Sequence, residues 1–188
     1  MILQLKFHFL LAALLSLSIT VNAFQDRDHL TPREVDLVKE AQELDQRTEV
    51  FIKAADRRLL VIAGGTPDAA TAKQLKKDTD AWGELPTGSR AELVGDIARI
   101  LDEAITNIDD VSARDERNPL ISKALRKLAA EATRIVNQLT PLSGQAKGEA
   151  EIASFEQLME NAESIVAAAN KLPPPVEKKK DKSKKAGQ

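Results

Sequence analysis

The stretch TPREVDLVKEAQELDQRTEVFIKAADRRLLVIAGG, residues 31–65, decides the fold class of this chain. Thr31 can cap a helix, and Pro32 suits the first helical position because it has no backbone N–H to satisfy. Glu34 stands three residues after Thr31, the spacing of a capping box. These residues predict that a helix begins at residue 32.

The apolar pattern that follows has the period of a helix. Steps of three and four residues place one set of mostly apolar side chains along one side: Val38, Ala41, Leu44, Thr48, Phe51, Ile52, Ala55, Leu59 and Ile62. Gly64 and Gly65 end the pattern, because glycine adopts the left-handed conformation that closes helices. The sequence therefore predicts one uninterrupted amphipathic helix over 32–63, about 48 Å long.

Three further amphipathic helices follow the same rules. Ser89 with Glu92 forms a second capping box, Asn118 can cap the helix after it, and the last runs from about 146 to 171, before the prolines at 173–175. Their apolar faces are Leu93, Ile97, Leu101, Ala104, Ile105, Ile108 and Val111; Ile121, Leu125, Leu128, Ala132, Ile135, Val136 and Leu139; and Ala150, Phe155, Leu158, Ala162, Ile165, Val166 and Ala169. None of these helices can bury its apolar face alone.

The expected fold is all-α: an antiparallel bundle of four long amphipathic helices plus one short connector helix over about 66–81. Aromatic residues make up only 3 % of the chain and tyrosine is absent, which argues against a β-sandwich. The connector is a fifth member or lies across one end, and Trp82 is expected to pin it by packing. A long coiled-coil oligomer is the alternative, although recurrent glycine and proline breaks disfavour an unbroken heptad seam. A homo-oligomer stays possible.

The first 23 residues have the pattern of a secretory signal peptide. Lys6 precedes a short apolar stretch, FHFLLAALLSLSI, and Val21 and Ala23 provide the small residues of a cleavage site. We expect cleavage after Ala23, a secreted or periplasmic protein, and no transmembrane segment afterwards. The chain then divides into a signal peptide (1–23), a helical domain (24–172) and a disordered Pro/Lys-rich tail (173–188). With no cysteine in the chain, the domain has to be stabilised by packing.

Charge is separated along the mature sequence. Residues 24–172 hold 27 acidic and 20 basic residues, whereas 173–188 holds six lysines and two acids. The six are candidates for binding an anionic surface such as lipid headgroups or envelope polymers: Lys178, Lys179, Lys180, Lys182, Lys184 and Lys185. The alternatives are a purely solubilising tail and one that folds back on the acidic body. Nucleic acid is disfavoured, because the tail has no arginine or aromatic residue.

The sequence predicts no catalytic residue, no cofactor and no complete metal site. His29 is the one histidine after residue 23 and lies outside the predicted helices, so Glu-x-x-His di-iron motifs are missing, and with Met159 as the only other candidate ligand a haem site is disfavoured. Asp78, Asp80 and Glu84 only partly match a calcium loop, because Ser89 stands where a bidentate carboxylate is needed. We therefore interpret 78–89 as a polar connector.

A second group of acids lies at the end of the predicted third helix. Asp109, Asp110, Asp115 and Glu116 oppose the helix dipole there, and we expect Arg114 and Arg117 to offset them through local salt bridges, with calcium as the alternative.

The function expected from these patterns is an exported, non-enzymatic helical bundle that acts as a binding or structural module in the cell envelope. Its partner would be a protein or an anionic surface. The alternative is a bundle that binds a small ligand or a divalent cation.

Overall fold

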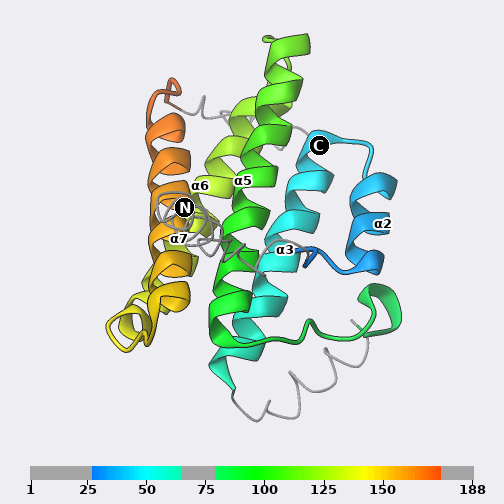
Figure 1. The fold of residues 1–188 in the computed structure, drawn as a ribbon. Helices are drawn as coiled ribbons and strands as arrows, with labels where there is room; N and C mark the ends of the chain where they lie inside the picture. The colour runs from blue at the N-terminus through cyan, green and yellow to red at the C-terminus, as the bar shows by residue number, and fades with distance from the viewer. Residues whose placement is uncertain (1–26, 65–78, 175–188) are drawn as a thin grey trace, which may run out of the picture.

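The computed structural model describes residues 27–64 and 79–174, and this part of the chain is helical with no strand (Figure 1). The all-α prediction is confirmed. The helices, in chain order, are α2 (Pro32–Glu40), α3 (Leu44–Ala63), α5 (Arg90–Arg114), α6 (Pro119–Ser143) and α7 (Glu149–Asn170). Residues 79–82 are also helical. The predicted signal peptide, most of the 66–81 connector and nearly all of the tail lie outside the described residues.

The predicted helix boundaries are confirmed where local hydrogen bonds set them. Gly64 has a φ of 58°, the left-handed conformation that closes α3. The start signals form as expected: capping boxes of Thr31 with Glu34 and of Ser89 with Glu92, and a cap by Asn118 on the N–H of Leu120.

The prediction of one continuous helix over 32–63 is wrong. The backbone leaves the helical conformation at Ala41, where ψ is 99°, and α3 begins only at Leu44. Side chains satisfy the carbonyls that the break leaves open. Arg47 donates from Nε and Nη2 to the carbonyl of Ala41 (3.0 and 2.9 Å), and Gln42 donates to the carbonyl of Lys39 (3.0 Å).

The break has a physical cause in the charges of the two helices. Glu34 in α2 accepts a hydrogen bond from Arg58 in α3 at 2.8 Å, although 24 residues separate them. In a straight helix the same residues would be roughly 36 Å apart. The chain has to turn back on itself to bring this buried carboxylate to its arginine, and α2 packs on α3 as a result.

The four long helices share one core. α5 packs on α3, α6 and α7, and α6 also packs on α3 and α7. Large aliphatic side chains fill the centre, while small ones allow the helix backbones to approach closely. The buried alanines within the helices are Ala54, Ala55, Ala98, Ala104, Ala124, Ala129, Ala132 and Ala162.

Three ion pairs join α3 and α6 along their length. Three acids of α3 pair with three bases of α6, each 78 residues later in the chain: Asp45 with Lys123, Glu49 with Lys127 and Asp56 with Arg134. Because the separation is constant, these two neighbouring helices run in the same direction (Figure 1). Within residues 27–64 and 79–174, no helix has the length and apolar character needed to cross a membrane.

Truncating the core should cost far more stability than truncating the outer face of α7. Leu128 is fully buried, whereas Met159 is 45 % exposed. We expect Leu128→Ala to lower the free energy of unfolding by about 2–5 kcal/mol, and Met159→Ala to change it by less than about 0.5 kcal/mol. Urea unfolding followed by circular dichroism measures both values. Equal losses in the two variants would contradict the assigned core.

Candidate functional site

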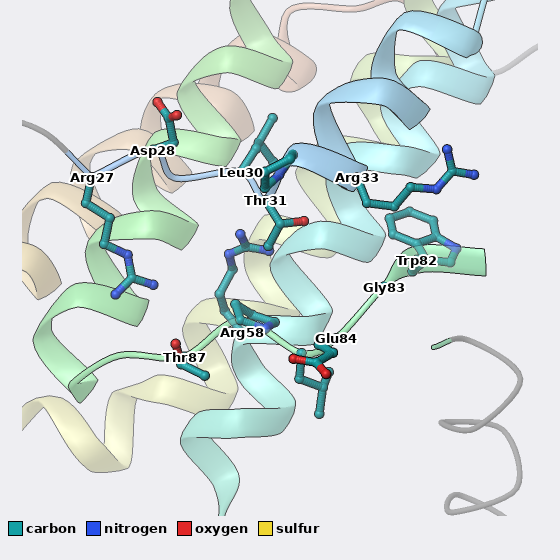
Figure 2. Close-up of a pocket in the computed structure, with 13 residues that line it drawn as sticks. Arg27, Asp28, Leu30, Thr31, Arg33, Arg58, Trp82, Gly83, Glu84 and Thr87 are labelled. Carbon is teal, nitrogen blue, oxygen red and sulfur yellow. The ribbon is translucent and has the colours of Figure 1, made fainter. Parts of the chain in front are cut away.

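A cavity of about 670 Å³ lies between the segment 27–33, which leads into α2, and the connector 82–87 (Figure 2). Arg58 of α3 lies in the middle of the lining residues, with Arg27 on one side and Trp82, near Arg33, on the other. The cavity therefore lies where three segments meet that are far apart in the sequence. Buried charges beside the cavity hold these segments together.

Glu34 is the centre of these charges. Its carboxylate is fully buried, and Oε2 accepts the backbone N–H of Thr31 (2.8 Å). Oε1 accepts hydrogen bonds from Arg57 Nε (3.1 Å) and Arg58 Nη1 (2.8 Å). Burial by itself raises the pKa of Glu34, but the hydrogen bond and charge of Arg58, the Thr31 N–H and the charge of Arg57 together bring this pKa below its usual value. Glu34 is therefore an ionised carboxylate in the core.

Arg57 attaches the connector to α3. Its Nη2 donates to the backbone carbonyls of Gly83 (3.1 Å) and Glu84, and its guanidinium lies 5.9 Å from the centre of the Trp82 ring. That distance suits a cation–π interaction. The expectation that Trp82 packs against the 66–81 connector helix stays a prediction, because 65–78 lies outside the described residues; the contact that the structure gives its ring is this cation on α3.

Arg58 attaches the segment before α2. Its Nη2 donates to the carbonyl of His29 (2.6 Å), and Nη1 donates to the carbonyl of Ala54 (2.8 Å) as well as to Glu34. The side chain is 99 % buried, since only 1 % of its surface is accessible. Its Nε is the one buried side-chain polar atom among the described residues that has no hydrogen-bond partner.

Asp96 of α5 completes the charged cluster. Its carboxylate is fully buried and accepts hydrogen bonds from Arg27 (3.0 Å) and Arg99 (2.7 Å), while Arg58 Nε lies 4.0 Å away. Burial raises the pKa of Asp96, and the charges and hydrogen bonds of the three arginines only partly offset this effect. The cluster thus places four arginines around two buried carboxylates, and Arg27 also lies 3.6 Å from a third, that of Glu92.

Sequence reasoning missed this cluster, although a signal was present. Arg58 falls on the apolar side of its helix, between Ala55 and Ile62, and Asp96 lies next to Leu93 and Ile97 in the same way. A charged residue at a core position needs an opposite charge. Arg99 is close to Asp96 in the sequence, but the other partners come from distant segments of the chain, so the sequence alone does not say which charges meet.

The predicted cation ligands are not brought together in the described part of the chain. Asp80 is exposed, and Glu84 uses its backbone carbonyl for Arg57, which puts a positive charge beside it. Asp78 lies outside the described residues. Across 27–64 and 79–174, no three His, Asp or Glu side chains are close enough to share a metal ion.

The expected salt bridges at the end of α5 do not form among the described residues. Arg114 Nε donates instead to the backbone carbonyl of Asp110 (3.0 Å), and the backbone N–H of Arg117 donates to Asp115 (3.3 Å). Arg114 thus satisfies a carbonyl of the last turn, where a cation is also favourable to the helix dipole. The two aspartates before it, Asp109 and Asp110, stay exposed.

A second surface lies on α7 and the loop before it. We call it the α7 groove, a hollow of about 460 Å³ lined by Ser143, Ala146, Ile152, Phe155, Glu156, Met159, Glu160 and Glu163. Ile152 and Met159 are each 45 % exposed, and they are the exposed large apolar side chains of the described chain. The three glutamates are exposed and form no ion pair with any described residue. On α3, by contrast, Asp45, Glu49 and Asp56 are all paired.

Comparisons with known proteins assign no family to this chain. No protein-family model matches it, and no curated protein or solved structure is significantly similar to it. The two surfaces therefore have to be interpreted from their own chemistry.

Replacing Glu34 should make the free energy of unfolding less sensitive to a fall in pH. Because the pKa of Glu34 is lowered by folding, its contribution is complete above the ordinary glutamate pKa of 4.5 and is lost as the pH falls through the folded value. We expect Glu34→Gln to lower the free energy of unfolding by about 3 kcal/mol at pH 7, and by clearly less below pH 4. Urea unfolding across this range measures the difference.

The control is Glu116→Gln, which removes an exposed carboxylate. It should change the free energy of unfolding little at any pH. A Glu34→Gln deficit that stays constant with pH would show that packing, and not the charge, accounts for the loss.

Proposed function

We propose that this chain is an exported, non-enzymatic helical bundle that acts as a binding or structural module in the cell envelope. The scaffold would be the antiparallel bundle of α3, α5, α6 and α7, with α2 and the connector held on it by the charged cluster. The lysine tail would attach the body to an anionic surface, and a protein partner could dock on the body.

The observation that supports this proposal best is the fixed point at which the tail leaves the body. Leu172 packs against the core, and Arg126 of α6 donates a hydrogen bond to the carbonyl of Pro173. The lysines of 178–185 therefore follow a well-anchored residue at the end of α7. A net charge of +4 beyond this point and −7 on the body would direct the tail, and not the body, to an anionic surface.

Neutralising the tail should abolish binding to anionic vesicles. Each lysine near such a membrane contributes about 1 kcal/mol, so replacing all six by glutamine should weaken binding about 100-fold or more. Sedimentation with vesicles that contain anionic lipid, at about 50 and 200 mM salt, measures this loss, and wild-type binding should weaken at the higher salt. Replacing the six by arginine keeps the charge and is the control. Equal binding by the glutamine variant would refute attachment through the tail.

A second candidate function is binding of a small anionic ligand in the cavity beside Arg58. Arg27, Arg33 and Arg58 line the cavity, against the two acids Asp28 and Glu84. The unpartnered Nε of Arg58 is a further donor. Arg27, Arg33 and Arg58 are each paired with an acid, namely Asp96, Glu40 and Glu34. This candidate therefore rests on that open donor, which suits an anion such as phosphate or a carboxylate and not a divalent cation.

Trp82 reports on this cavity, because it is the only tryptophan of the chain and lines the wall. We expect inorganic phosphate to change its fluorescence in a saturable way, and Arg33→Gln to weaken the apparent affinity at least threefold, about 0.7 kcal/mol. Arg114→Gln removes the same charge from an exposed site outside the cavity and should leave the titration unchanged. No saturable change, or equal effects of both substitutions, would contradict this candidate, and a response to calcium alone would favour the cation.

A further inference from the structure

The α7 groove has the chemistry of a site for lysine side chains. Apolar surface from Ile152 and Met159 lies next to the carboxylates of Glu156, Glu160 and Glu163, which have no partner among the described residues. A lysine combines an apolar stem with a cationic end, so one side chain can cover the apolar surface and reach a carboxylate. A purely apolar partner would leave the glutamates unpaired, and a small cation would leave the apolar surface exposed.

The chain carries such lysines within reach. Pro174 is the last described residue, and the hydrogen bond of Pro173 to Arg126 fixes where the following segment starts. Lys178 to Lys185 can extend roughly 13 to 36 Å from that point at 3.3 Å per residue. Measured back along α7 from its end at Asn170, Glu163 is about 10 Å away and Ile152 about 27 Å away. Residues 171–174 separate the two starting points and span at most about 13 Å, so the lysines can reach the groove from Glu163 to Glu156.

We propose that the tail lysines of 178–185 dock in the α7 groove of the same molecule. Their ammonium groups pair with Glu156, Glu160 and Glu163, and their stems cover Ile152 and Met159. Each exposed ion pair is weak, but the tether keeps the lysines at an effective concentration of about millimolar order beside the groove. The docked state is therefore reversible and sensitive to salt.

The acids at the end of α5 are the competing site. Asp109, Asp110 and Glu116 are exposed and offer negative charge, but no large apolar side chain is exposed beside them in the described chain. They can attract lysines but cannot cover their stems. The combination of charge and apolar surface selects the α7 groove.

Docking has a regulatory consequence, which rests on the proposed function. The same lysines cannot pair with the α7 glutamates and with an anionic surface at the same time. Attachment to such a surface and docking in the α7 groove therefore compete for the same lysines.

A spin label in the tail tests the docking directly. The chain has no cysteine, so Ser183→Cys gives one labelling site among the lysines. In the full mature chain we expect the nitroxide to reduce the NMR amide signals of residues 152–163 more than those of other exposed helix faces. This reduction of the amide signals should disappear at about 1 M salt, where charges are screened beyond about 3 Å. It should also disappear in the variant E156Q/E160Q/E163Q.

Two variants with the same change of charge serve as controls. D36N/E43Q/D102N removes three exposed acids elsewhere and should leave the α7 effect intact, as should D109N/D110N/E116Q. The proposal is overturned if residues 152–163 show no preferential loss, if the α7 variant keeps it, or if only the α5-end variant removes it. Vesicle sedimentation of the same samples tests the proposed function independently. Preferential signal loss at residues 152–163 without vesicle binding would support docking and refute the proposed function.

Discussion

The buried carboxylate of Glu34 is the constraint on which the arrangement of the N-terminal half depends. A charge without water around it needs opposite charges and hydrogen-bond donors, and here these come from Arg57 and Arg58, 23 and 24 residues later. The chain meets this need by breaking its first helix and folding α2 back on α3. The same two arginines then bind the carbonyls of His29 and Gly83, so that one carboxylate organises α2, the segment before it and the connector. Charge therefore adds to the apolar packing of Leu30, Val35 and Val38 in attaching these parts to the bundle.

The opposite side of the molecule follows a different rule. Around Glu34 and Asp96 nearly every polar atom has a partner, and the acids of α3 are paired with bases of α6. In the α7 groove, Glu156, Glu160 and Glu163 form no ion pair with any described residue, and Ile152 and Met159 place exposed apolar surface beside them. Charged side chains that are already paired within the molecule stabilise the fold, whereas unpaired charges next to exposed apolar side chains can contact a binding partner. This contrast is why the proposed interaction is placed on α7.

Much of the helical content could be predicted from the sequence, because its causes are local. Caps at Thr31, Ser89 and Asn118 act within three residues, and apolar periodicity is visible in any one helix. The break after Glu40 could not be predicted, since its cause is a contact between residues 24 positions apart. The cavity was missed for the same reason: Arg27, Arg58 and Trp82 come from three segments whose meeting depends on that break. The tail lysines were visible as a charge pattern, but the groove within their reach exists only after α7 has buried its other face.

The central claim is that the lysines are shared between the α7 groove and an anionic surface. The most direct test is the affinity of E156Q/E160Q/E163Q for anionic vesicles, compared with that of D36N/E43Q/D102N, which has the same net charge. If the groove competes for the tail, the α7 variant binds the vesicles more tightly than the control, because its tail no longer has to be released. Equal affinities of the two variants would contradict the claim, and so would vesicle binding by neither.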